Sequence, residues 1–273
     1  MSTHASSVPS ASAPLPRVQT AARPKLGTAA LLNKYFYTAT GVFFLLVAIV
    51  GFSGFYFQGM AYRPGGLRPI TPPIRGLVIT HGVTMSLWLI MLVVQPLLVA
   101  TGNRKKHMVM GWVGTALAAI VTVSGVIVGC SFSKYMPPEA KMWGISPLEF
   151  TIVPLGAIAL FAVFVTLGVA LRRKPALHRP MMFLATLAGL TAALNRIDWL
   201  NAPLIGTVFD KAFGPFFVIV VIGVAMVVIR SLLAKRFDKP LAIGVAVVIA
   251  STTVMWHLAT TPAWMSIASA ITR

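Results

Sequence analysis

Seven long apolar segments are the feature that most limits what this sequence can fold into. They cover roughly residues 35–58, 74–101, 108–131, 147–171, 180–203, 214–234 and 241–261. A helix needs about 20 mostly apolar residues to cross the hydrocarbon core of a bilayer, and each segment meets that length. Only 10% of the residues are charged and 57% are hydrophobic, whereas a soluble domain carries about 25% charged residues. The sequence therefore predicts an all-α, polytopic integral membrane protein, a seven-transmembrane-helix bundle over residues 31–273.

The Lys and Arg residues gather at alternate connections between these segments. They precede the first segment and fill the connections after the second, fourth and sixth, as in Arg104-Lys105-Lys106 and Arg172-Arg173-Lys174. Short connections rich in Lys and Arg stay in the cytoplasm, which predicts a cytoplasmic N-terminus, a C-terminus outside and a place in the cell inner membrane. Anionic lipid is then the expected partner of the +18 net charge, and nucleic acid is not needed to explain it.

Residues 1–30 are rich in Ser, Ala, Pro and Thr and contain no acidic residue. They lack the apolar core of a signal peptide, so we expect a disordered basic tail. An organellar transit peptide shares this composition, which keeps an organellar membrane open as an alternative. The single cysteine, Cys130, excludes an intrachain disulfide and a cysteine-based metal cluster.

Four of the five histidines lie in or beside the predicted helices. His81 and His257 are expected near the outer ends of the second and seventh helices, and His107 and His178 at the inner starts of the third and fifth. Two imidazoles from facing helices can hold a haem iron, and two haems stacked across a bilayer carry electrons between its sides. The matching depths of these histidines in the membrane predict a haem-binding electron-transfer protein, with His81/His257 and His107/His178 as axial pairs of haem b. The alternatives are buried imidazoles bonded to carbonyls, or histidines at the lipid phosphates.

Other ionisable side chains within the apolar segments are also candidates, because burying them in hydrocarbon is costly. Glu149 opens the fourth segment, and in the fifth Asn195 and Asp198 would share one face of a helix while Arg196 points elsewhere. An ion pair or network that pins the helices is the structural interpretation of Arg196 and Asp198.

Two other functions remain open. The histidines, Glu149 and Asp198 could line the path of a proton-coupled transporter. The chain could instead be a non-catalytic accessory or assembly subunit of a respiratory or photosynthetic complex, since short loops and apolar faces suit burial among other membrane subunits. The sequence does not decide whether the chain is an enzyme.

An internal repeat is suggested by the two basic triplets. When Arg104-Lys105-Lys106 is aligned with Arg172-Arg173-Lys174, each precedes a histidine that opens a return helix, and His81 falls opposite Glu149. Two independent cytoplasmic loops would produce the same triplets. Within the first hairpin, Gly125 and Gly129 form a small-xxx-small pair that predicts close approach of a neighbouring helix.

The stretches "HGVTMSLWLIMLVVQPLLVATG", "HMVMGWVG" and "ALHRPMMFLATLA" carry a resemblance over roughly residues 74–200. The chain resembles a family of bacterial multi-helix membrane proteins in which a His-Gly helix, an H-x-x-M-G turn and a P-x-x-H-(K/R)-x-M element recur. It also faintly resembles the ascorbate-reducible di-haem cytochrome b family, which implies haem b and redox partners. That family places ligands on four consecutive helices, whereas the fourth segment here has no histidine. The resemblance therefore leaves the partner of His81 open.

Overall fold

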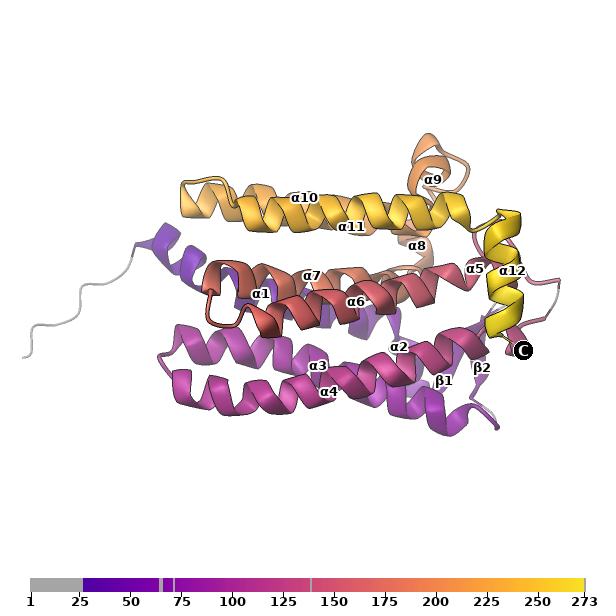
Figure 1. Ribbon diagram of the computed structural model, residues 1–273, viewed down its shortest axis with the longest axis horizontal. Coiled ribbons are helices and arrows are strands. Elements are labelled where there is room, and N and C mark those ends of the chain that lie inside the picture. The colour runs from indigo at the N-terminus through magenta and orange to yellow at the C-terminus, as the bar shows by residue number, and fades with distance from the viewer. Residues whose placement is uncertain (1–26, 64–65, 71, 138, 273) are drawn as a thin grey trace, which may run out of the picture.

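The computed structural model of the chain describes residues 27–63, 66–70, 72–137 and 139–272. Most of the expected tail, residues 1–26, lies outside these ranges. Within them, seven stretches of helix are long and apolar enough to cross a membrane, as the sequence predicts, and they run side by side as one bundle (Figure 1). Their main helices are α1 Thr28–Gly51, α3 Arg75–Ala100, α4 Arg104–Ser131, α6 Ile152–Ala170, α7 Pro175–Leu194, α10 Phe217–Ala234 and α11 Lys239–Leu258.

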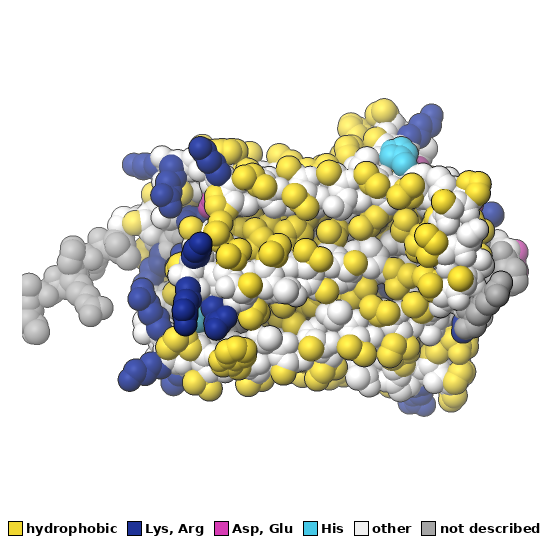
Figure 2. All heavy atoms as spheres, in the orientation of Figure 1, with side chains coloured by type: hydrophobic (Ala, Val, Ile, Leu, Met, Phe, Trp, Pro, Cys, Tyr) yellow, Lys and Arg dark blue, Asp and Glu magenta, His cyan; other side chains and the backbone are white. Residues whose placement is uncertain are grey.

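Short elements cover one end of the bundle. They are α2 Ser53–Gln58, α5 Pro147–Phe150, α8 Asp198–Asn201, α9 Val208–Phe213 and α12 Pro262–Ile271, with single 3₁₀ turns at Ser133–Tyr135 and Gly214–Phe216. Strands β1 Met60–Arg63 and β2 Gly66–Pro69 pair antiparallel. We call this end the hairpin end (right in Figure 1). The other end, which carries the turns after α3, α6 and α10, is the basic end, because Lys and Arg gather there (left in Figure 2).

Four helices form a ring that positions the candidate site. Helix α3 packs on α4 and α7, and α6 packs on the same two helices. α4 and α7 therefore occupy opposite corners of the ring. α1 covers α3 and α7, while α11 packs on α7, α10 and α6. The interior of α7 is almost continuously buried, from Pro180 to Leu194, so this helix forms the centre of the hydrophobic core.

Glycines allow the closest helix contacts. A Cβ atom at Gly51 would lie 2.2 Å from the backbone oxygen of Ala193, so α1 touches the backbone of α7 at that point. On α4, a Cβ at Gly125 or Gly129 would lie 2.7 Å from a side-chain atom of Ile158 or Leu155 of α6. The close approach predicted from the small-xxx-small pair is therefore confirmed.

Two helices have ends that differ from the predicted ends. The first helix begins at Thr28 instead of residue 35, and a turn at Phe52 separates it from α2. The fifth was predicted over 180–203 but runs from Pro175 to Leu194. There the amide of Asn201 donates to the backbone oxygens of Leu194 (2.7 Å) and Ile197 (3.0 Å), so the chain folds back onto the end of α7. An extended helix over this stretch was therefore a wrong prediction.

Large apolar side chains cover the sides of the bundle (yellow in Figure 2). Val109 of α4 is 70% exposed, Leu232 of α10 72% and Ile243 of α11 65%. Soluble monomers rarely expose contiguous apolar surface on this scale. The surface is compatible with a multi-pass membrane protein.

Candidate functional site

His107 and His178 meet at the basic end. They open α4 and α7, the two helices at opposite corners of the ring, and their ring centres lie 6.2 Å apart with the planes at 83°. Both side chains are half-buried. The structure thus brings together the two histidines that the sequence places at equivalent positions of two hairpins.

Each of these imidazoles is anchored through Nδ1. That of His178 lies 2.7 Å from the backbone oxygen of Gly168 on α6, and that of His107 lies 3.3 Å from the backbone oxygen of Gln95 on α3. A carbonyl oxygen can only accept, so Nδ1 is the protonated nitrogen of His178, and the lone pair of its neutral ring is on Nε2, the form in which histidine binds a metal. Nδ1 of His107 also faces the side-chain amide of Gln95, whose nitrogen lies 2.5 Å away in the amide orientation that satisfies its other neighbours.

The imidazole of His81, nearer the hairpin end of the four-helix ring, is also protonated at Nδ1. Its Nδ1 lies 3.0 Å from the hydroxyl oxygen of Ser124 on α4. The Ser124 hydroxyl donates its only proton to the backbone oxygen of Ile120 (2.7 Å), so Nδ1 of His81 is the donor and Nε2 carries the lone pair. The sequence did not indicate Ser124 as a partner, because a serine within an apolar helix usually bonds only to its own preceding turn.

A cavity of about 480 Å³ lies beside His81. Its walls come from α1, α3, α4, α6 and α7, and they are mostly apolar, with Met85, Leu89 and Phe161 among them. Polar side chains line it near the hairpin end, including Lys141, Asn195, Arg196 and Asp198. This size and this mostly apolar lining are those of a pocket for a small organic molecule.

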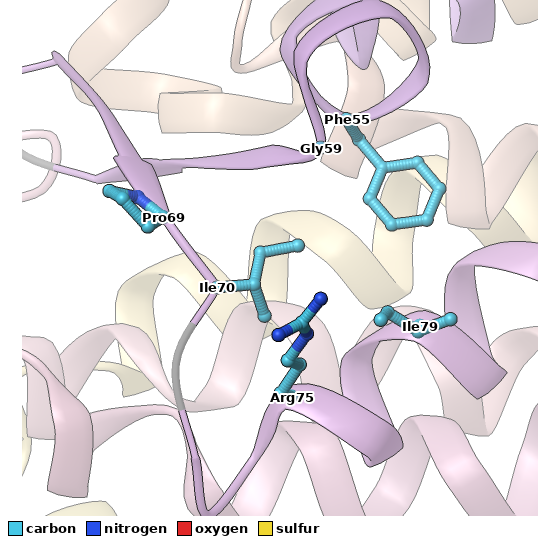
Figure 3. A pocket seen from close by; sticks show the side chains of 6 residues that line it. All are labelled: Phe55, Gly59, Pro69, Ile70, Arg75 and Ile79. Atoms are coloured by element: carbon cyan, nitrogen blue, oxygen red, sulfur yellow. The ribbon is translucent and has the colours of Figure 1, made fainter.

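A smaller pocket of about 360 Å³ adjoins the cavity, since Phe55 and Ile70 line both. Arg75, at the start of α3, points its guanidinium group into this pocket between Ile70 and Ile79 (Figure 3). A cation therefore stands next to the cavity at the hairpin end.

Trp88 separates the cavity from the histidine pair. It is 3% exposed, and its ring packs edge-to-face on Phe161 of α6 with centres 5.0 Å apart. Its indole nitrogen donates to the hydroxyl of Thr186 on α7 at 3.0 Å. The ring contact and the hydrogen bond therefore join α3, α6 and α7 at a depth between His81 and Gln95.

The structure does not bring His81 and His257 together. His257 lies in the last turn of α11, and its side chain is exposed on the surface of the bundle. Helix α11 packs on α6, α7 and α10, whereas His81 faces α4 across the ring. The two histidines share a depth, but they belong to different faces of the protein.

Glu149 completes a helix cap. Its carboxylate accepts from the backbone N–H of Ser146 at 2.6 Å, and the Ser146 hydroxyl accepts from the N–H of Glu149 at 3.3 Å. This reciprocal capping box starts α5. Glu149 is not part of the cavity lining, so the structure gives it a structural contact instead of a place beside His81.

Asn195, Arg196 and Asp198 lie beyond the end of α7, not on one face of a continuous helix. Arg196 bonds to the backbone oxygen of Ala192 and places its guanidinium group 4.6 Å from the centre of the Phe52 ring. The Oδ1 atom of Asn195 is buried and has no hydrogen-bond partner among the described residues. Other atoms of Asn195 line the cavity.

Comparison with family models, with curated proteins and with solved structures finds no match for this chain.

Proposed function

We propose that this chain is an integral membrane haem-binding electron-transfer protein. It spans the cell inner membrane seven times, with the basic end in the cytoplasm, and it binds haem b at the basic end through His107 and His178. The observation that supports this assignment most strongly is the pair of anchored imidazoles 6.2 Å apart at opposite corners of the ring. Bound there, a haem would supply reversible one-electron chemistry of its iron.

The spacing of the two rings suits a metal between them. A metal–nitrogen bond to histidine is about 2.0–2.1 Å long, so an atom held by both Nε2 nitrogens would space the ring centres about 6 Å apart. The contacts of Nδ1 with Gln95 and Gly168 hold each ring in place, and the Gly168 carbonyl leaves the lone pair of His178 on Nε2. Such anchoring orients an imidazole ligand and raises its basicity.

The number of protein side chains available as ligands favours haem over a bare metal ion. Among the described residues, no third His, Cys, Asp or Glu joins the pair to form a metal-binding group. A structural metal ion takes four protein ligands in most sites, and this pair offers two. A haem would bring nitrogen ligands of its own, and His107 and His178 would supply the two that the protein must provide.

An open glycine and a nearby cation also support a haem at this pair. Gly111 follows His107 by one turn of α4, and a Cβ atom added there would meet nothing within 4 Å. Arg172 lies over the ring of Trp112 on α4 at 5.5 Å, so a cation from the α6–α7 turn stands beside the start of α4. Haem propionates would find cationic partners among Arg172 and its neighbours.

No second haem is assigned to His81 and His257, because one faces the ring interior and the other is exposed on α11. Reduced-minus-oxidised spectra of the purified protein test the proposal. A b-type α-band that is lost in His107→Ala and in His178→Ala, and retained in His257→Ala, is the expected result. Absence of haem from the folded wild type would favour the accessory-subunit function.

A further inference from the structure

We infer that the cavity beside His81 is a binding site for a membrane-soluble quinol, a dihydroxylated aromatic ring with an apolar tail. No proposed haem ligand pair uses this cavity. The choice of a redox carrier among amphipathic molecules rests on the proposed electron-transfer function. The site itself rests on the shape and chemistry of the cavity.

An acceptor in the wall selects a ligand that donates a hydrogen bond. Ser124 fixes the tautomer of His81 so that Nε2 has the lone pair. An acceptor without a partner in an apolar cavity is costly, so a ligand with a hydroxyl donor gains from a bond to this nitrogen. A quinol carries such a hydroxyl on its aromatic ring, and a second one that can lie toward the polar side chains of the lining.

The apolar part of the cavity lining suits a ligand that has an aromatic ring and an apolar tail. Met85, Leu89 and Phe161 continue the apolar wall into the middle of the ring of helices. Gly189 keeps part of this wall free of side chains, since a Cβ there would meet only the Cε of Met85, at 3.9 Å. The volume of about 480 Å³ is within the usual range for organic ligands, about 300–1,000 Å³. Sugars and other strongly polar reductants would leave many of their polar groups unpaired in such a cavity.

The position of the cavity also fits a redox carrier. Its deep wall includes Phe161, whose ring contacts Trp88, and Trp88 separates the cavity from the level of His107 and His178. A ligand held at His81 would therefore be separated from the proposed haem by a buried aromatic pair. The second hydroxyl group of the quinol would lie toward the polar wall of the cavity, and its tail would lie toward the apolar wall.

Binding of tritiated decylhydroquinone to the protein in nanodiscs, under anaerobic conditions, tests the inference. Loss of one hydrogen bond predicts affinity about five- to tenfold lower in His81→Ala. Gly189→Leu should remove saturable binding, because its side chain fills the cavity while leucine suits a helix better than glycine. Ser124→Ala, which keeps the imidazole and loses its anchor, should weaken binding less than His81→Ala. His257→Ala is the matched control at the same depth and should bind like the wild type.

The dimethyl ether of the same probe separates hydrogen bonding from apolar partition. It should bind the wild type about five- to tenfold more weakly than the quinol, and His81→Ala should not weaken it further. Equal binding of ether and quinol would show a site for apolar tails, such as lipid chains, and would overturn the inference. Unchanged binding in Gly189→Leu would also overturn it. Haem is measured in the same samples: quinol binding without haem contradicts only the electron-transfer function, and haem without quinol binding contradicts only this site.

Discussion

The indole nitrogen of Trp88 on α3 donates a hydrogen bond of 3.0 Å to the hydroxyl oxygen of Thr186 on α7. The bond crosses the side of the helix ring where α3 and α7 make few other contacts. Both residues are almost fully buried. The ring is therefore held together at its middle by a polar contact, with the cavity toward one end and the histidine pair toward the other.

Trp88→Phe removes this bond and part of the packing on Phe161. We expect a loss of about 1–3 kcal/mol in the free energy of unfolding, because a buried hydroxyl loses its donor. Thermal unfolding in detergent measures the effect. Trp199→Phe is the matched control, since Trp199 is 74% exposed and its replacement should change stability by no more than about 0.5 kcal/mol. Equal melting temperatures for the two variants would contradict the role of Trp88.

Gly51→Ala tests the contact between α1 and α7. The new methyl group would lie 2.2 Å from the backbone oxygen of Ala193, and such overpacking costs about 1–3 kcal/mol. Gly76→Ala, in the first turn of α3, meets nothing within 4 Å and should stabilise the protein by up to about 0.5–1 kcal/mol. Opposite shifts of the melting temperature are expected. A Gly51→Ala protein as stable as the wild type would show that the two helices are further apart.

Ser146→Ala and Glu149→Gln test whether Glu149 is structural. Loss of the capping hydroxyl should lower stability by about 0.5–2 kcal/mol, whereas glutamine can still complete a capping box and should cost less. Both proteins should keep the haem content of the wild type, because the cap of α5 lies at the hairpin end and His107 and His178 lie at the basic end. Haem loss in a well-folded Glu149→Gln protein would give this carboxylate a functional role after all.

The proposed orientation rests on the charge at the basic end and can be tested by labelling. In a Cys130→Ser background, Glu139→Cys at the hairpin end should react with a membrane-impermeant maleimide on intact cells. Lys105→Cys at the basic end should react only after lysis, because connections rich in Lys and Arg remain in the cytoplasm. The reverse pattern would contradict the proposed topology.

The positions of the long helices could be predicted because their signal is local. Length and hydropathy alone define a segment that can cross a bilayer, and α3 and α11 begin and end close to where the sequence places them. The end of α7 could not be predicted in this way. It depends on Asn201 folding back onto Leu194 and Ile197, a contact that the apolar character of the stretch conceals.

The candidate site was only partly predictable for a related reason. Lipid is as apolar as a leucine side chain, so hydropathy does not tell which face of an apolar helix points inward. His81 and His257 therefore look alike in sequence, although one bonds to Ser124 and the other is exposed. The proximity of His107 and His178 could be predicted from the sequence, because each opens the return helix of a basic hairpin. Two similar hairpins can place such positions at opposite corners of a ring of helices.

The most direct test of the account is the haem content of four proteins: wild type, His107→Ala, His178→Ala and His257→Ala. Haem is extracted from each monodisperse sample, and its amount per chain is compared with the reduced-minus-oxidised spectrum. The account predicts a single b-type haem in the wild type and in His257→Ala, and its loss from both His107→Ala and His178→Ala. A folded wild-type protein without haem, or haem retained in both of the latter variants, would contradict it.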